Sequence, residues 1–151
     1  MLSNTCKYAI RAVTYLAFKS DKKDTKKRIG LKVISEELNI PTPFLGKILQ
    51  NLAKNKLLVS SKGPHGGFRL AKSSDKISLY DIVIIIDGKD FFDNCIFGYE
   101  VCKNKKSKQK ICPIHPKSGP IRNELKALFK GLTLAEVSES FENNGFSKVV
   151  F

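Results

Sequence analysis

Three of the four cysteines in the chain lie close together, and a histidine follows the last of them. The set is Cys95, Cys102, Cys112 and His115. Thiolate sulfur and imidazole nitrogen are usual protein ligands of iron–sulfur clusters and of zinc. Structural zinc sites usually pair their ligands at short spacing, and only Cys112 and His115 do so here. The residue types alone leave three interpretations open: an iron–sulfur cluster, a zinc ion, or three free thiols.

The balance of charge indicates a polyanionic partner. The 151 residues include 27 Lys and Arg against 14 Asp and Glu, which gives a formal net charge of +13. Nucleic acid and an anionic membrane surface would both attract such a chain. The longest strongly apolar run covers only residues 82–86, whereas a membrane-spanning helix needs about 20 apolar residues. The pattern therefore favours nucleic acid and no membrane partner.

The cellular compartment limits what the cysteines can do. The N-terminal sequence MLSNTCKYAIRAVTYLAF places Lys7 and Arg11 inside its apolar pattern and lacks a small-residue cleavage site, so it is not typical of a signal peptide. We therefore expect a cytoplasmic protein. In that reducing compartment, thiols act as ligands, sensors or buried apolar groups more often than as disulfides. Cys6, which is remote from the other three in sequence, is interpreted as a buried thiol.

The elements that would position a DNA-reading surface begin with three helices. Apolar residues at helical spacing predict a helix over residues 4–19, a solvated loop over 19–28 and a second helix from residue 31. Thr42 is predicted to cap the third helix, with Pro43 in its first turn. The second helix is expected to bury Leu31, Ile34 and Leu38, and the third Phe44, Leu45, Ile48, Leu49 and Leu52. Two short helices joined by a Pro-marked turn are typical of a helix-turn-helix.

A β-hairpin is predicted directly after these helices. Two short strands, 57–60 and 68–71, flank a tip that is rich in Gly and Pro. This order is that of a winged helix, in which a helix enters the major groove and the hairpin lies against the neighbouring backbone or minor groove. The expected fold is mainly α with a small β-hairpin wing: a winged helix-turn-helix domain plus a C-terminal dimerisation helix.

The C-terminal half is predicted to contain three further helices and a long loop. Ser78 and Asp81 have the spacing of a capping box, so residues 78–86 are expected to be helical. A cysteine-bearing loop follows over 89–116, and then a helix over 120–132 that ends at Gly131. Thr133 and Glu136 form a second capping box before a short terminal helix. The apolar residues of the helix 120–132 are expected to form a dimer interface; they are Ile121, Leu125, Leu128, Phe129 and Leu132.

Several segments of the chain resemble the Rrf-type family of bacterial winged-helix transcriptional regulators. They are KYAIRAVTYLA, IPTPFLGKILQNLAKNKLL, KGPHGGFRL, the spaced cysteines ending in CPIH, and GLTLAEV. The resemblance runs essentially end to end, as one continuous domain over residues 1–140. It implies a homodimer formed through a long C-terminal helix, a partly palindromic double-stranded DNA operator, and a cluster held between the winged-helix domain and that helix.

The resemblance also indicates which residues would read DNA. Pro43, Gly46 and Lys47 match base-contacting positions of the family, and Lys47 is the only strong hydrogen-bond donor of the three. Lys62 matches a family Arg that enters the minor groove, where the adjacent glycines let the backbone approach DNA closely. The full candidate set is Thr42, Pro43, Gly46, Lys47, Gln50, Asn51, Lys54, Lys62, His65 and Arg69.

For the cysteine site, the resemblance implies a [2Fe–2S] cluster on Cys95, Cys102, Cys112 and His115, with a [4Fe–4S] cluster or zinc as alternatives. The chain divides into a DNA-binding region (1–88), the cysteine-bearing loop (89–116) and a dimerisation helix with its tail (117–151). The expected function is a transcriptional repressor that senses iron–sulfur, redox or nitric-oxide status. The alternative is a cluster-free or zinc-bound regulator controlled by thiol oxidation or a partner protein.

An enzyme is not expected. No carboxylate pair, nucleophile motif or phosphate-binding loop accompanies the Cys and His residues, whereas a winged helix explains the positive charge. The sequence likewise indicates no small-molecule substrate.

Overall fold

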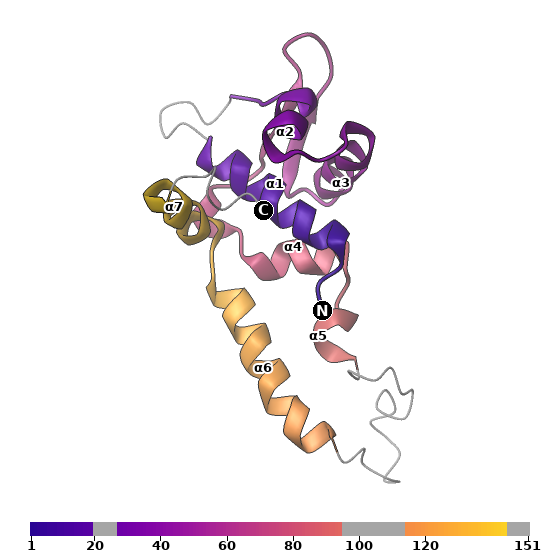
Figure 1. The fold of residues 1–151 in the computed structure, drawn as a ribbon, viewed down its shortest axis with the longest axis vertical. Helices are drawn as coiled ribbons and strands as arrows, with labels where there is room; N and C mark the ends of the chain where they lie inside the picture. Colours follow the sequence, from indigo (N-terminus) through magenta and orange to yellow (C-terminus); the bar gives the residue numbers. More distant parts are fainter. Residues whose placement is uncertain (20–26, 95–113, 145–151) are drawn as a thin grey trace.

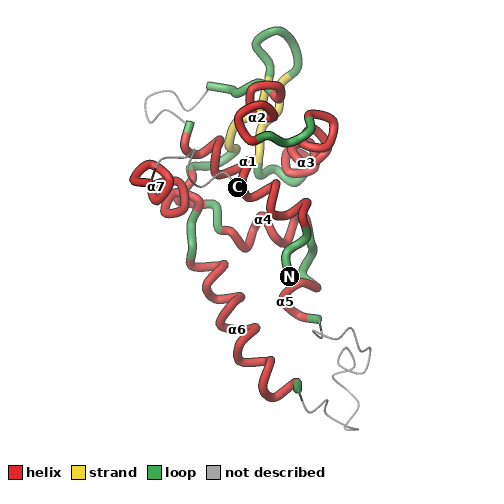
Figure 2. Tube along the Cα trace, viewed as in Figure 1, coloured by secondary structure: helices red, strands yellow, loops and turns green. Residues whose placement is uncertain are grey.

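The computed structural model of the chain describes residues 1–19, 27–94 and 114–144. Helices dominate it, and a single hairpin forms its two-stranded antiparallel sheet (Figure 2). The order of elements is α1 (Asn4–Phe18), α2 (Leu31–Leu38), α3 (Thr42–Lys54), β1 (Leu58–Ser61), β2 (Gly67–Leu70), a 3-10 turn η1 (Ser74–Lys76), α4 (Leu79–Ile86), α5 (Asp90–Asp93), α6 (His115–Gly131) and α7 (Leu134–Asn144). The prediction of a mainly helical fold with a hairpin wing is confirmed.

Helix α1 lies at the centre of the molecule (Figure 1). It packs against α7 and α4 on one side and against α3 and β2 on another. Its interior positions Ala12, Val13 and Leu16 are almost fully buried, as predicted from their helical spacing. Ser3 caps its N-terminus, since the Ser3 hydroxyl oxygen accepts a hydrogen bond of 3.0 Å from the Cys6 N–H.

Helices α2 and α3 form the predicted helix-turn-helix, but the cap between them differs from the prediction. Pro41 occupies the N-cap position of α3, and no side chain caps the helix. The Thr42 hydroxyl instead lies 2.7 Å from the hydroxyl of Ser35. Because the Ser35 hydroxyl donates to the Ile40 carbonyl at 2.7 Å, Thr42 is the donor of that pair. The prediction of Thr42 as a cap was wrong, because Pro41 occupies the cap position and the Thr42 hydroxyl is hydrogen-bonded to Ser35 of α2.

The buried face of α3 forms much of the core of the helix-turn-helix. Leu45, Ile48, Leu49 and Leu52 are buried, as predicted. Phe44 was predicted to be buried with them, but 37% of it is exposed. Its ring lies at the margin of the core and meets the Tyr8 ring edge-on at 5.7 Å, so Phe44 covers α1 instead of filling the interior.

The wing is a hairpin with an extra stretch of backbone paired to its second strand. Leu58 pairs with Leu70 and Ser61 with Gly67, which shifts the predicted strands by one residue. Ile29 exchanges two backbone hydrogen bonds with Phe68, of 3.0 and 2.9 Å. Gly67 makes this contact possible: it has φ +150°, and a Cβ added there would lie 2.3 Å from the Ile29 carbonyl oxygen.

The second half of the chain follows the predicted capping signals and departs from the predicted loop. Ser78 and Asp81 form a capping box at the start of α4. Thr133 and Glu136 form another at the start of α7, with the Thr133 N–H donating to the Glu136 carboxylate at 2.7 Å. Helix α6 ends at Gly131, as predicted.

The predicted loop over 89–116 contains helical residues at both ends. Helix α5 forms because Phe92 is buried in a small aromatic core with Tyr80 and Phe129. Helix α6 begins at His115 instead of residue 120, since the Lys117 and Ser118 N–H groups both donate to the Ile114 carbonyl and close its first turn. None of the helices within the described residues is long and apolar enough to cross a membrane.

Candidate nucleic-acid interface and cysteine segment

Helix α3 presents an exposed polar face opposite its buried one. We call this the recognition face; its residues are Pro43, Lys47, Gln50, Asn51 and Lys54, all of them exposed. Their spacing of three and four residues places them on one side of the helix. The two lysines lie two turns apart, and Gln50 lies between them. The arrangement can offer charged and neutral hydrogen-bond donors to a groove of duplex DNA.

Two other predicted residues of α3, Gly46 and Thr42, contact α2. Gly46 is buried, and a Cβ added there would lie 3.2 Å from the Leu31 side chain. It therefore allows α2 to approach α3, and its predicted contact with bases stays a prediction. Thr42 is exposed, but its hydroxyl hydrogen is used by Ser35 in the turn.

The side chain of Asn51 is held by its neighbour one turn later. Asn55 donates from Nδ2 to the Asn51 carbonyl oxygen at 2.9 Å and to the Asn51 Oδ1 at 3.1 Å. The Asn51 amide is thereby oriented on the helix surface. Preorganisation of this kind lowers the entropic cost of a polar contact.

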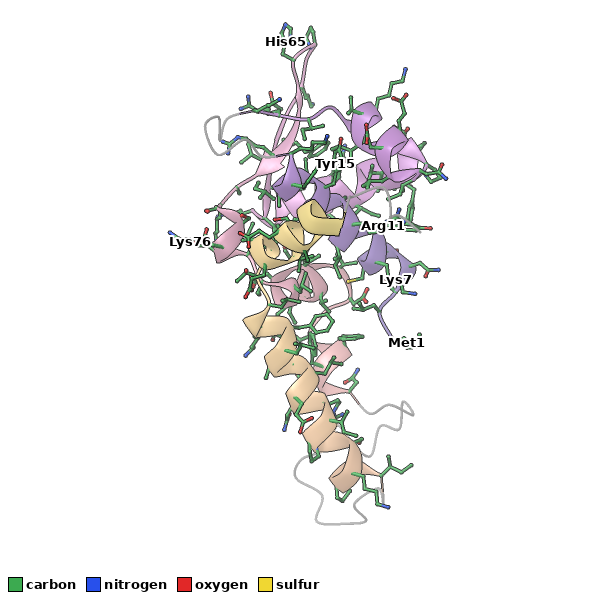
Figure 3. All side chains as sticks on the ribbon, turned by 60° about the vertical axis from the view of Figure 1, so that its left-hand side comes forward. Met1, Lys7, Arg11, Tyr15, His65 and Lys76 are labelled. Carbon is green, nitrogen blue, oxygen red and sulfur yellow. The ribbon has the colours of Figure 1, made fainter. Side chains whose placement is uncertain are left out.

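The wing extends from the molecule beside α2, and His65 lies at its tip (Figure 3). Lys62 and His65 are exposed there, as a contact with DNA would require. Arg69 lies further down β2 and is only partly exposed. Its Nη1 donates to the Leu70 carbonyl at 3.0 Å, and its Nε is buried without a hydrogen-bond partner among the described residues. Arg69 thus belongs to the base of the wing.

The three clustered cysteines, Cys95, Cys102 and Cys112, lie outside the described residues. Of His115, the backbone is described and forms the first residue of α6. Among the described residues, no group of three or more His, Cys, Asp or Glu side chains could hold a metal ion. The donor set of three thiolates and one imidazole suits either an iron–sulfur cluster or zinc in its chemistry.

The residues that precede the cysteine segment are fixed to α6, the helix that begins directly after it. Arg122 Nη1 donates to the Asn94 carbonyl at 2.6 Å, and Lys126 Nζ lies 2.9 Å from an Asp93 carboxylate oxygen. This contact with Asp93 raises the pKa of Lys126. Neither Arg122 nor Lys126 was predicted from the sequence, although their four-residue spacing places both on one face of a helix and is a signal for a shared contact.

Cys6 is a buried thiol, as predicted. It is fully buried, and burial together with the nearby Asp87 carboxylate raises its pKa to about 12. A thiol with such a pKa is protonated at neutral pH, so it is a poor nucleophile and a poor metal ligand.

The apolar residues of α6 divide between the interior and the surface. Ile121 and Leu128 are 66% and 59% exposed, and Leu125 is 37% exposed. Phe129 instead packs on Phe92, with ring centroids 5.6 Å apart. Leu132 is half-buried. Only the first three of the five predicted dimerisation residues therefore form an exposed apolar stripe, which we call the α6 stripe.

Comparison with known proteins gives one consistent result. Residues 2–140 match the Rrf2 family, described as iron-dependent transcriptional regulators. A protein of Aquifex aeolicus, provisionally named an HTH-type transcriptional regulator, is 30% identical over 146 residues, which cover 97% of this chain and 96% of that protein. The HTH-type transcriptional regulator IscR of Erwinia tasmaniensis is 26% identical over 141 residues, covering 93% and 80% of the two chains.

Solved structures share the fold. CymR, the global cysteine regulator of B. subtilis, superposes with a TM-score of 0.75 at 18% identity and covers 93% of this chain and 97% of its own. IscR of T. potens superposes with a TM-score of 0.74 at 20% identity, covering 96% and 90%. These relatives are transcriptional regulators and not enzymes. The chain therefore belongs to the Rrf2 family of DNA-binding transcriptional regulators.

Proposed function

We propose that this regulator represses transcription as a homodimer that binds a partly palindromic operator through the recognition face of α3 and the tip of the wing. The observation that carries the proposal is the exposed face of α3, on which Lys47, Gln50 and Lys54 lie in line. Lys47 is expected to contact a guanine edge or a phosphate, and Lys54 a phosphate. Lys62 is expected to reach the minor groove beside the recognition helix.

The α6 stripe supports the homodimer. Helix α6 extends away from the helix-turn-helix (Figure 1) and carries Ile121, Leu125 and Leu128 on its outer surface. Two copies that bury this stripe against each other would present two recognition faces to successive half-sites. A contiguous exposed apolar stripe on a helix is usual at such interfaces.

The DNA proposal is tested by selecting duplexes from a randomised library with the purified chain and measuring affinity against salt. Three cations in each protomer, Lys47, Lys54 and Lys62, predict a slope of log K against log salt of about −5 for the dimer. The Lys47→Ala variant is expected to bind about tenfold more weakly. Lys89→Ala removes an exposed lysine outside the interface and should bind normally. A salt-independent affinity, or no enrichment of any sequence, would contradict the proposal.

We further propose that Cys95, Cys102, Cys112 and His115 hold a [2Fe–2S] cluster, for which four such donors are the required number. When bound, the cluster supplies one-electron redox chemistry and reactivity toward oxidants and nitric oxide. His115 opens α6, so any change in its ligation acts at the start of that helix. The contacts of Arg122 and Lys126 with residues 93 and 94 attach the other end of the cysteine segment to the same helix.

Anaerobic purification followed by an absorption spectrum and by iron, sulfide and zinc analysis tests this assignment. Iron and sulfide in equal amounts with visible absorption support the cluster, and Cys102→Ala or Cys112→Ala should abolish both. The matched control is Cys6→Ala, which should keep the cluster because Cys6 is buried with a raised pKa. Colourless protein with zinc, or with no metal, would instead favour regulation by thiol oxidation or by a partner protein.

A further inference from the structure

A basic cavity lies on the winged helix-turn-helix domain, apart from the recognition face and the wing tip. Its volume is about 230 Å³, and it is bounded by the end of α3, the chain after β2, the turn η1 and helix α4. Three exposed lysines surround it: Lys56 follows α3, Lys72 follows β2, and Lys76 ends η1. Lys76 projects from the edge of the molecule in Figure 3. The rim therefore carries three positive charges from three separate segments.

The floor of the cavity is apolar. Leu57 and Ile77 are 7% and 2% exposed, and Ile84 and Ile85 of α4 are half-buried beside them. Asp81 also borders the cavity, so three lysines face one carboxylate and a net positive charge remains; the Asp81 Oδ2 accepts hydrogen bonds from the Ser78 N–H at 3.0 Å and the Ser78 hydroxyl at 2.8 Å. A cationic rim above an apolar floor fits a ligand with an anionic end and an apolar body.

The backbone of Lys56 provides a second, independent observation. Lys56 has φ +61° and occupies the left-handed position after α3. Its N–H donates to the Ala53 carbonyl, and the Leu57 N–H donates to the Leu52 carbonyl, which is the Schellman pattern of a helix end. Glycine is the usual residue at this position, because a Cβ there is strained.

Helix α2 ends with the same hydrogen-bond pattern, so the residues at the left-handed positions after the two helices can be compared. Asn39 has φ +51°, and the Asn39 and Ile40 N–H groups donate to the Glu36 and Ser35 carbonyls. Asparagine tolerates this conformation well, whereas lysine gains nothing local from it. A strained residue that carries a charge to the rim of a cavity points to a role for that charge.

We propose that this cavity binds a small organic anion, a carboxylate with a short aliphatic or aromatic body, with Lys56, Lys72 and Lys76 holding the carboxylate. The apolar body would lie on Leu57, Ile77 and Ile85. The volume suits a ligand smaller than the drug-sized molecules for which pockets of about 300 Å³ and more are typical. The proposal does not depend on the cluster or on the operator.

The test uses the full chain, without DNA, and titrates benzoate and hexanoate while recording isoleucine methyl NMR spectra. We expect saturable shifts at Ile77, Ile84 and Ile85. Benzyl alcohol lacks the charge and sulfate lacks the apolar body, so both should bind at least about tenfold more weakly. If no shift saturates below about 10 mM ligand, the proposal is wrong. Binding of sulfate as tight as that of benzoate would also overturn it.

The Lys56→Gly variant separates the role of the charge from the stability of the fold. Relief of the strained φ should raise the melting temperature, while loss of the charge should weaken benzoate binding about tenfold. Asn39→Gly is the matched control, since it changes the equivalent position of α2 and should leave binding unchanged. Lys72→Gln with Lys76→Gln should also weaken binding. If benzoate binds all variants alike, the lysines do not form the site and the proposal is wrong.

Discussion

Ser3 and Asp87 join the start of α1 to the end of α4. The Ser3 N–H donates to Asp87 Oδ2 at 2.9 Å, and the Ser3 hydroxyl donates to Asp87 Oδ1. The same hydroxyl oxygen accepts from the Cys6 N–H, so one serine serves as a helix cap and as a tertiary contact. Asp87 is the last residue before the turn at Gly88 that leads to α5 and on to the cysteine segment. The contact therefore fixes the N-terminus beside the part of the chain that precedes the proposed cluster site.

Removing this contact should destabilise the protein. An anion at the C-terminal end of a helix is unfavourable by about 0.3–1 kcal/mol, so removing Asp87 would by itself stabilise α4. Two hydrogen bonds to a carboxylate outweigh that term, and we expect Asp87→Ala to lose about 1–2 kcal/mol of unfolding free energy. Urea denaturation measures the loss. Ser3→Ala removes the hydroxyl and keeps the backbone N–H, so in a double-mutant cycle with Asp87→Ala additive effects would show that the hydroxyl–carboxylate hydrogen bond contributes nothing.

The buried thiol of Cys6 should make the fold sensitive to alkaline pH. Burial and Asp87 raise its pKa in the folded state from 9.0 to about 12. Between these values the unfolded chain has lost the thiol proton and the folded chain retains it, so stability falls as the pH rises from about 9. Below pH 9 both states are protonated, and the group contributes no pH dependence.

The alkaline effect is measured by comparing unfolding free energies of the chain and of Cys6→Ala between pH 8 and pH 10.5, with the other three cysteines replaced by Ser in both. The slope should be less negative in Cys6→Ala, whatever its absolute stability. Identical slopes in the two proteins would show that Cys6 ionises normally in the folded state.

The α6 stripe should determine the oligomeric state. Leu128 is 59% exposed on one protomer, so Leu128→Glu places a charge on the surface of a monomer at little cost but in the interior of a dimer at a large one. We expect sedimentation to show monomers for Leu128→Glu and dimers for the parent chain. Glu124→Ala, on the same helix but without a change to the stripe, should remain dimeric. Dimers of Leu128→Glu at micromolar concentration would place the interface elsewhere.

Elements with local signals could be predicted from the sequence. The capping boxes at Ser78 and at Thr133 each involve residues three positions apart, and the Gly-rich tip predicts the hairpin. Neither signal depends on the rest of the fold. The apolar periodicity of α1 and α3 is equally local, and it gave most of the core correctly.

Elements that depend on distant partners could not be predicted in this way. Thr42 has the residue type of a helix cap, but Ser35 takes its hydroxyl across the turn. Helix α5 is too short to show a periodic pattern, and it forms because Phe92 meets Tyr80 and Phe129, which come from other helices. No local pattern in the sequence of α3 indicates that Gly46 is buried, and only the packing of Leu31 against it shows this. The DNA-contacting residues and the cluster ligands stay predictions, because their partners are separate molecules.

The contact between Gly67 and Ile29 should make the wing intolerant of any side chain at position 67. A Cβ at Gly67 would lie 2.3 Å from the Ile29 carbonyl oxygen and 2.9 Å from the Gly30 nitrogen, and both are backbone atoms that cannot move aside alone. Gly67→Ala would have to break the pairing of Ile29 with Phe68. We expect a loss of more than about 1 kcal/mol of unfolding free energy, because Ala fits neither the space nor the positive φ.

Gly131→Ala provides the opposite case within the same chain. Gly131 is the last residue of α6 and has nothing within 4 Å of an added Cβ, so this substitution should stabilise the fold by up to about 0.5–1 kcal/mol through helix propensity. Thermal denaturation of both variants checks the pair. Amide hydrogen exchange then locates the defect of Gly67→Ala: protection should be lost at the Ile29 and Phe68 N–H groups and kept in α4 and α6. An Ala at position 67 that leaves the Phe68 amide protected would mean that the Ile29 segment does not pair with the wing.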